Sequence, residues 1–338
     1  MKPVSMRHAI ASHKKEVSIA VSVRTATPVK ANKRSFLRKL WRYKTLILMC
    51  LPAMLLIFVF AYAPMPGLYI AFTNFKFNLG IMKSPFIGLS NFRFLFLSGD
   101  IAKLTRNTVL YNLVFILLGN IIHLIVALLL NEIRNVYFRK ISQTIMLLPT
   151  FISYVLVGLF VYSFLNFDYG VINNLLRATG GEPFSFYGDQ AAKYWPAIIV
   201  FVNIWKGTGY GTIIYFAAIM GIDSEMLEAA HIDGANTLQR IWHILLPNLR
   251  GTFIILVLLA LGRIMRGNFD IFFNLVRNNA LLLPNTDIIE TYVWRAMMTN
   301  FNFSQGSAVS LFQSVIGFIT VLFFNWLVKR YDPDYALF

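Results

Sequence analysis

The stretch SEMLEAAHIDGANTLQRIWHILLP, from Ser224 to Pro247, decides how the rest of the chain is interpreted. It is a long polar interruption between apolar segments, and its pattern is typical of two short helices joined by a turn. The side chain of Asp223 or Ser224 can cap a helix that runs through His231, by accepting hydrogen bonds from its first free backbone N–H groups. Gly234 then allows a sharp break, because glycine tolerates backbone angles that other residues resist.

The second helix of this stretch is expected from Thr237 to Ile244. It should stop before Pro247, because proline has no backbone N–H and can restart a helix only among its first residues. Taken by itself, the pattern also fits an ordinary cytoplasmic helical hairpin. The rest of the sequence must decide whether the stretch has a more specific role than that.

The composition places the chain in a membrane. Of its 338 residues, 57% are hydrophobic and only 14% are charged. Soluble domains are about half apolar and about a quarter charged, so this balance favours a bilayer. The single cysteine, Cys50, falls inside an apolar stretch, which excludes an internal disulfide and argues against a metal cluster.

The net charge of +16 is concentrated near the amino terminus. Residues 1–44 hold twelve Lys or Arg and one Glu, which gives +11 of that total. A hydrophobic span follows at once and no nucleic-acid recognition fold accompanies the basic residues, so we predict no nucleic-acid partner. The block instead fits a cytoplasmic flank that obeys the positive-inside rule. Residues 1–33 are polar and mixed, and we expect a disordered cytoplasmic tail there rather than a cleaved signal.

Six stretches are apolar and long enough to cross a bilayer, whose hydrocarbon core of about 30 Å needs about 20 helical residues. Four of them precede the polar stretch at Glu228, an even number, so that stretch returns to the cytoplasm together with the basic flank. The same alternation places the carboxyl terminus in the cytoplasm. The predicted spans are 45–64, 107–130, 142–165, 194–220, 251–275 and 307–328.

The polar stretch resembles the EAA loop of ATP-binding-cassette importer permeases in three groups of residues, Glu228-Ala229-Ala230, Asp233-Gly234-Ala235 and Leu246-Pro247. In that family the loop docks in a cleft of the ATPase subunit and transmits its movement. Other segments are similar to sugar-importer permeases of the maltose and polysaccharide type, above all to the oligosaccharide and polysaccharide subfamily. This likeness covers residues 36–338 and includes Leu147-Leu148-Pro149, Gly267–Phe272, Asp287–Tyr292 and Asp332–Phe338.

The resemblance implies an all-α integral membrane protein with the type I importer permease fold. Six spans would fill residues 34–338, with the coupling loop at 221–247. It implies a non-catalytic subunit of the bacterial cytoplasmic membrane, in contact with lipids. The partners would be a second homologous permease, two ATPase copies, an extracellular or periplasmic solute-binding protein and an oligosaccharide.

ATP and Mg²⁺ would be held by the ATPase, so this chain would bind no cofactor. The sequence agrees, because it contains no GxxxxGK[ST] phosphate loop. Glu228 and Arg240 are expected to make ionic contacts with the ATPase, and Gly234 to set the elbow of the loop. The residues assigned to coupling are Glu228, Ala229, Ala230, Asp233, Gly234, Ala235, Arg240 and Pro247.

Charged residues in the fifth predicted span indicate a substrate path, because charges inside a membrane cost about 2.5–3.5 kcal/mol each and usually face a cavity or a partner. They recur every three or four residues, which would place them on one face of a continuous helix. In one hypothesis Asp270 neutralises Arg266 in a structural network. In the other, the guanidinium groups grip a substrate carboxylate. The polar residues of this face are Arg263, Arg266, Asp270 and Asn274.

In the subfamily that the chain resembles, small or neutral residues are usual at the positions of Arg263 and Arg266. This departure favours an anionic substrate, such as a uronate oligosaccharide or alginate. Other path candidates lie inside the spans, although such residues often serve helix packing. His123 is expected to be a hydrogen-bonded interior histidine, and no metal site or catalytic cluster is predicted. The added path candidates are Asn112, Tyr154, Asn203, Trp205 and Gln313.

Two other classes of protein stay open at this point. An ion-coupled secondary transporter would need membrane carboxylates near the midplane, and Asp270 is the obvious candidate. A membrane receptor or scaffold would leave the polar face of the fifth span without a purpose. Co-purification with an ATPase would separate all three.

Overall fold

The computed structural model describes residues 41–331. The predicted tail at 1–33 and the carboxyl-terminal motif at 332–338 lie outside this range. The chain divides into two compact units, with the boundary between Met65 and Pro66. Each unit is described by itself.

The first unit contains one apolar helix. α3 (Lys44–Ile57) accommodates Pro52 and continues through a π-helical turn at Phe58–Tyr62. The continuous helical segment extends past the unit boundary through the 3₁₀ helix Met65–Phe72, and its 29 residues from Lys44 to Phe72 are apolar enough to cross a membrane. This segment contains the first predicted span.

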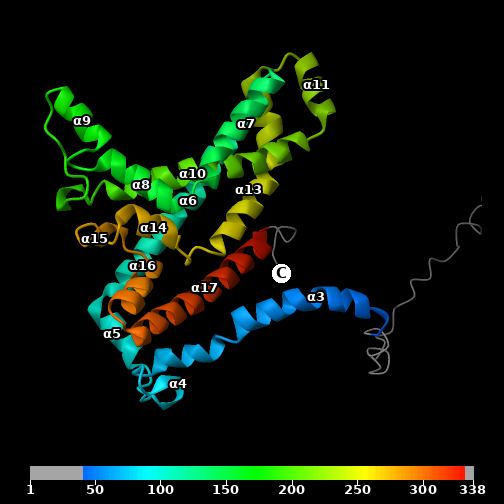
Figure 1. Cartoon of the computed structure of the whole chain (residues 1–338). Coiled ribbons are helices and arrows are strands. Elements are labelled where there is room, and N and C mark those ends of the chain that lie inside the picture. Colours follow the sequence, from blue (N-terminus) through cyan, green and yellow to red (C-terminus); the bar gives the residue numbers. More distant parts are fainter. Residues whose placement is uncertain (1–40, 332–338) are drawn as a thin grey trace, which may run out of the picture. The chain divides into compact units, whose positions relative to one another are not determined.

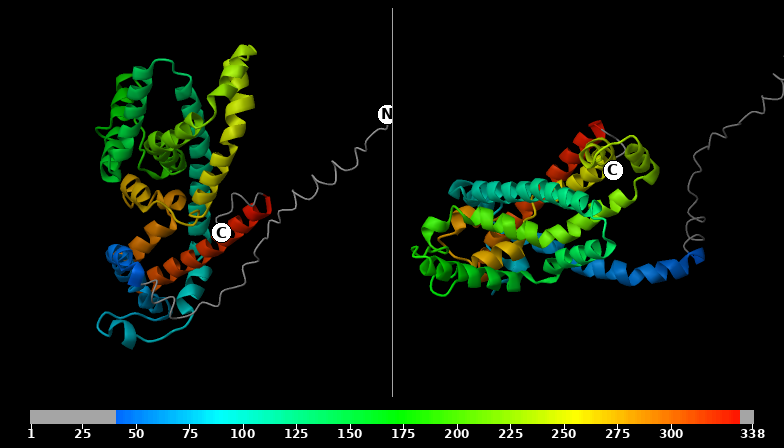
Figure 2. Two further views of the ribbon diagram at one scale, coloured as in Figure 1. Left: turned by 90° about the vertical axis from the view of Figure 1, so that its right-hand side faces the viewer. Right: turned by 90° about the horizontal axis from the view of Figure 1, so that it is seen from above.

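The second unit is a bundle of helices around α6 (Asp100–Asn131) and α10 (Trp195–Met220), which pack along each other (Figures 1 and 2). The described chain has no strand, and an isolated bridge joins Thr73 to Phe86. The remaining helices are α4 (Gly80–Lys83), α5 (Ser90–Ser98), α7 (Val136–Phe151), α8 (Tyr154–Leu165), α9 (Val171–Ala178), α11 (Ser224–Ile232), α12 (Thr237–Arg240), α13 (Leu246–Leu261), α14 (Phe269–Val276), α15 (Leu283–Thr286), α16 (Ile289–Trp294) and α17 (Phe303–Tyr331), with 3₁₀ or π-helical turns at Asp189–Ala191, Ile241–Leu245 and Arg295–Thr299.

Buried apolar side chains of this unit form three clusters. One surrounds Trp195 and Phe272 and includes the segment before α10. A second joins α5, α6, α16 and α17 around Val309. The third lies around Tyr215 and Leu245, where residues of the predicted coupling loop pack on α6 and α10.

Five helices of the described chain are long and apolar enough to span a membrane, and a bent helix pair makes a sixth. The second, fourth and sixth predicted spans fall on α6, α10 and α17. The third, at 142–165, is not straight, because α7 and α8 meet at an angle of 94°. Ser153 begins α8 as its cap, accepting a hydrogen bond from the Leu156 N–H at 3.4 Å.

The fifth predicted span, at 251–275, is wrong in its second half. The helix ends at Leu261, and α14 begins separately at Phe269. Gly262 and Gly267 flank the interruption, and the Asn268 side chain caps α14 by accepting from the Ile271 N–H. The charged residues of this region therefore do not share one continuous helical face.

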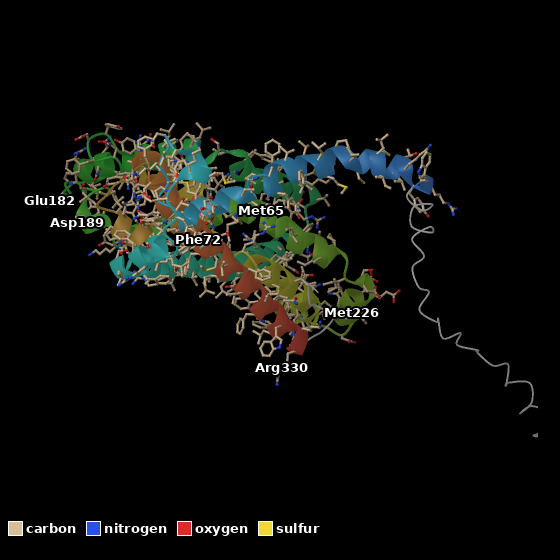
Figure 3. The ribbon with its side chains drawn as sticks, turned by 90° about the horizontal axis from the view of Figure 1, so that it is seen from below. Met65, Phe72, Glu182, Asp189, Met226 and Arg330 are labelled. Carbon is tan, nitrogen blue, oxygen red and sulfur yellow. The ribbon has the colours of Figure 1, made fainter. Side chains whose placement is uncertain are left out.

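Two polar segments lie at opposite ends of the second unit. Glu182 and Asp189, in the segment between α9 and α10, lie at the end opposite to Met226 of α11 (Figure 3). Arg330, near the end of α17, lies closer to the Met226 end (Figure 3). This arrangement agrees with a coupling loop on the membrane side opposite to the 180–190 segment.

Candidate functional site

The first helix of the coupling loop has the predicted boundaries and caps. The Asp223 side chain accepts a hydrogen bond from the Glu225 N–H at 3.0 Å and starts α11. At the other end, Gly234 has a φ of +78°, a conformation that strains residues with a Cβ. Its N–H donates to the His231 carbonyl, and the Ala235 N–H donates to the Ala230 carbonyl. This pair of bonds is a Schellman motif, and it confirms Gly234 as the elbow.

The second helix of the loop does not stop where the sequence predicts. Asn236 and Gln239 form a reciprocal capping box, a signal that the N-x-x-Q spacing carries and our sequence reasoning missed. The helix then passes Pro247 through a π-helical turn, in which the Leu246 N–H donates to the Ile241 carbonyl. The wider turn accommodates the missing donor and the ring of Pro247. Thr237–Leu261 is thus one helical rod of 25 residues.

The structure brings most of the predicted coupling residues together. A cleft of about 350 Å³ is lined by Ala230, Asp233, Gly234, Ala235, Gln239, Arg240, His243 and Ile244. Glu228 and Ala229 are exposed on α11, next to this cleft in sequence, whereas Pro247 does not line it. Sequence reasoning missed the exposed apolar side chains of the loop, which are Met226, Ile232, Leu238 and Trp242.

Arg240 has a partner within the chain. Its guanidinium contacts the Glu132 carboxylate at 3.3 Å and the Thr237 hydroxyl at 3.3 Å. Glu132 follows directly after α6, so the contact fastens the second helix of the coupling loop to the end of α6. The predicted ionic contact of Arg240 with an ATPase stays a prediction, and Arg240 would have to share its guanidinium to make it.

The interruption after Leu261 is held by side chains from three other helices. Asn112 of α6 donates to the Ile264 carbonyl at 2.7 Å and to the Arg266 carbonyl at 3.2 Å. Gln313 of α17 donates to the Met265 carbonyl, and the Glu290 carboxylate of α16 accepts from the Gly267 N–H at 2.6 Å. These bonds satisfy backbone groups that the broken helix leaves free inside the membrane.

A cavity of about 500 Å³ lies beside this interruption, lined by Gly262, Arg263, Met265, Arg266, Glu290, Ser310, Gln313, Ser314 and Gly317. The structure therefore brings three of the predicted path residues together, with Arg263 and Arg266 on a loop instead of a helix and Gln313 on α17. It adds Glu290, which sequence reasoning did not select. One Glu290 oxygen also accepts from Gln313 at 2.6 Å, and the other is buried without a partner among the described residues.

Asp270 does not join this cavity. It lies in the first turn of α14 and is exposed, and among the described residues it forms no ion pair with Arg266. The hypothesis of an Asp270–Arg266 network is therefore wrong within this chain. The reason is the separate start of α14, which removes the helical spacing on which that pairing depended.

A second cavity, of about 480 Å³, contains Tyr154 and Asn203 among the predicted path residues. Its wall also holds Phe115, Gly119, His123, Thr150, Ile204, Lys206, Gly207, Tyr210 and Gly211. The Asn268 amide donates to the Tyr154 hydroxyl at 3.0 Å, which connects this wall to the start of α14. Trp205 is half exposed and lines neither cavity, and Asn112 serves the helix interruption instead.

His123 lies in the interior as predicted, but the hydrogen bond expected for its ring is not found at Nε2 in the described part of the chain. Its Nε2 atom is buried and has no hydrogen-bond partner within residues 41–331, although a bonded interior histidine is expected. A Cβ built on Gly211 would come within 2.1 Å of the imidazole, so the glycine makes room for the ring. No group of three or more metal-ligating side chains is found among the described residues.

Lys206 explains the bend between α7 and α8. Its Nζ donates to the carbonyls of Pro149, Thr150 and Ile152 at 3.0, 2.9 and 2.5 Å. The last carbonyls of a helix lack partners, and a cation at that end also complements the helix dipole. All three N–H groups are engaged, so Lys206 lines the cavity without a free donor to offer a ligand.

The long apolar helices, the capped loop at one end and the polar cavities between the helices define a membrane-spanning permease subunit. The model of a family described as the inner membrane component of binding-protein-dependent transport systems matches residues 119–336. The chain belongs to this family. Such permeases are subunits of ABC transporters in which a separate subunit hydrolyses ATP, so this chain is not itself an enzyme. An ion-coupled transporter and a receptor are not favoured.

The similar proteins align with this chain over most of their length. Protein LplB of Bacillus subtilis (strain 168) is 37% identical over 300 residues, 89% of this chain and 93% of that protein. The polygalacturonan/rhamnogalacturonan transport system permease protein YteP of the same strain is 34% identical over 305 residues, 90% and 94% of the two chains. A permease in the crystal structure of a bacterial ABC transporter involved in import of the acidic polysaccharide alginate matches with a TM-score of 0.78 and 32% identity, covering 88% of this chain and 99% of that one.

Proposed function

We propose that this chain is the permease subunit of an importer for acidic oligosaccharides, and that Arg263 and Arg266 contact the substrate carboxylates. The observation that carries this proposal is the cavity at the interrupted helix, which collects two guanidinium groups against the single carboxylate of Glu290. A guanidinium binds a carboxylate through two parallel hydrogen bonds. The alginate importer and YteP, which handle acidic polysaccharides by their descriptions, support the same class of substrate.

The second cavity complements this one. Tyr154, Asn203 and His123 present hydroxyl, amide and imidazole groups, which suit the neutral hydroxyls of a sugar ring. In the proposed path the carboxylates contact the arginine loop and the hydroxyls contact the second cavity. The Asn268–Tyr154 hydrogen bond connects the wall of the second cavity to the start of α14, which follows the arginine loop.

The helical rod Thr237–Leu261 would couple the ATPase to this path. At 1.5 Å per residue it is about 37 Å long, and it runs from the coupling loop directly to Gly262 and Arg263. A displacement of the loop would therefore be passed to the arginines without an intervening hinge. ATP-driven closure of the ATPase would pull the loop and open the cavity outward, and hydrolysis would reset it.

The proposed complex has a second homologous permease, two ATPase subunits and a solute-binding protein outside the membrane. The structure of the alginate transporter with its alginate-bound periplasmic protein supports the solute-binding protein as a partner, for a similar chain. In the proposed orientation, the amino terminus, the coupling loop and the carboxyl terminus lie in the cytoplasm of a bacterial cell.

The test is ATPase activity of the reconstituted complex with its binding protein, comparing uronate with neutral oligosaccharides. We expect acidic oligosaccharides to stimulate ATP hydrolysis, and Arg263→Ala and Arg266→Ala each to raise the half-maximal concentration about tenfold, since charge-assisted contacts are worth about 1.5–3 kcal/mol. Arg250→Ala, an exposed change in the middle of the rod, is the matched control. Equal stimulation by neutral sugars, or arginine variants that match the control, would refute the substrate class.

A further inference from the structure

A groove between α6 and α10 is separate from both cavities and has a different chemistry. Its volume is about 430 Å³. On the α10 side the small residues Pro196 and Ala197 leave space between the helices. The walls are otherwise formed by Leu110, Tyr111, Val114 and Val200, with Arg106, Asn107 and Asn285.

Two polar side chains of the groove walls, Tyr111 and Asn107, are engaged within the protein. The Tyr111 hydroxyl donates to the Asn285 carbonyl at 2.7 Å, and the Asn107 amide donates to the Asp287 carbonyl at 3.0 Å. The interior of the groove therefore offers mainly apolar surface, and Asn285 is the remaining uncharged polar side chain of its lining. A sugar would lose its hydrogen bonds to water there, whereas a hydrocarbon chain would lose none.

One end of the groove carries an exposed cation. Arg106 contacts the Asn107 side-chain oxygen at 3.3 Å, and it forms no ion pair with a carboxylate in the described chain. Lys103 lies one turn earlier on the same face of α6. From Asn107 to Asn131 the helix contains no Asp, Glu, Lys or Arg, so Arg106 marks the membrane interface. Phosphate headgroups lie at that level.

We propose that this groove binds one acyl chain of an anionic phospholipid, whose headgroup contacts Arg106 and Lys103. The apolar wall descends from Arg106 to Val114, eight residues or about 12 Å along α6. Basic residues at the interface followed by an apolar groove match a lipid that stands upright beside the helix. The proposal does not depend on which substrate the protein carries.

The test is native mass spectrometry of the intact complex purified in mild detergent, titrated with phosphatidylglycerol and, separately, with phosphatidylcholine. We expect the wild-type protein to retain phosphatidylglycerol preferentially. Arg106→Gln should reduce this preference about fivefold, since a basic residue at an anionic surface contributes on that order. Ala197→Trp should abolish retention of the lipid by filling the groove. Leu129→Trp is the matched control, because Leu129 is 63% exposed at the other end of α6.

A photoreactive benzoylphenylalanine in place of Ala197 identifies the occupant directly. A crosslink to phospholipid supports the proposal, and a crosslink to another protein subunit overturns it. Retention of phosphatidylglycerol by Ala197→Trp at the level of the control would also overturn it. Equal preference for the two lipids in the wild-type protein would refute the role of Arg106. All of these readouts are independent of transport.

Discussion

Lys206 shows how one residue can shape a span. It is 8% exposed, it lies in the middle of α10, and its three donors satisfy the carbonyls at the end of α7. The Thr150 hydroxyl returns a hydrogen bond to the Lys206 carbonyl at 3.0 Å. Without this cation, the bend that presents Tyr154 to the cavity would deprive the Thr150 and Ile152 carbonyls of this donor inside a membrane, whereas the Pro149 carbonyl would keep the Ile152 N–H. Lys206 is thus a positioning residue for the cavity wall.

We predict that Lys206→Met destabilises the protein, because each buried acceptor left unsatisfied costs about 1–3 kcal/mol. The measurement is the thermal unfolding midpoint of the purified complex in detergent. Lys193→Met is the control, since Lys193 is exposed just before α10. A Lys206→Met midpoint equal to that of the control would show that the three hydrogen bonds contribute nothing to stability.

Glu290 illustrates a residue that local sequence patterns do not reveal as part of a site. It belongs to a short helix, α16, that is not a predicted span, and it lies far in sequence from Gly262 and Arg263. Its role depends on contacts with Gly267 and Gln313, which only the packing of α16 against α17 creates. An intramembrane carboxylate is a functional signal in general, but nothing in the sequence places Glu290 beside the arginines.

At the scale of elements, the coupling loop leads directly into the rod Thr237–Leu261. α11 ends in the Schellman turn at Gly234, and the capping box at Asn236 begins a helix that continues to Leu261. The Arg240–Glu132 contact ties the start of this rod to the end of α6. A rod without an internal break transmits displacement, whereas the break predicted at Pro247 would have absorbed it.

We predict that Glu228→Lys and Gly234→Pro uncouple transport from ATP hydrolysis while the protein remains in the membrane. Glu228→Lys reverses a charge on an exposed face, and Gly234→Pro is incompatible with a positive φ. Substrate-stimulated ATPase activity of the reconstituted complex should fall by about tenfold or more, the order of a lost charged contact at an interface. Full stimulation in both variants would remove these residues from the coupling role. Glu225→Lys, also on α11, tests whether the position of the charge matters.

At the scale of the whole molecule, the polar loops lie at opposite ends of the second unit (Figure 3). The segment with Glu182 and Asp189 lies at one end, and α11 with Met226 lies at the other. Such a separation is what a transporter subunit needs, because substrate delivery and ATPase docking occur on different sides of the membrane. Residues near both ends are exposed and can be labelled.

We predict that an impermeant maleimide added to right-side-out membrane vesicles labels Glu182→Cys and leaves Met226→Cys unlabelled. Both variants would be built on Cys50→Ser, so that the introduced cysteine is the single thiol of the chain. In inside-out vesicles the pattern should reverse. Labelling of Met226→Cys from outside in intact vesicles would contradict the cytoplasmic assignment of the coupling loop.

The sequence by itself determined the helical membrane class, five of the six span positions to a useful degree, and the turn geometry of the coupling loop. These features are local: a span needs about 20 apolar residues, and a cap needs particular residues within one turn. The spacing around Gly234 is enough to specify its turn. The capping box of Asn236 and Gln239 is likewise a local feature, because its N-x-x-Q spacing lies within one turn.

Only the tertiary structure decided where the spans break and which charges meet. The helix ends at Leu261 because Asn112 and Glu290, on other helices, satisfy the freed backbone groups. The bend after α7 exists because Lys206 of α10 caps it. In a membrane a backbone can leave the helix only where another element supplies hydrogen bonds, so the interruptions that build the cavities are properties of packing and not of any single segment.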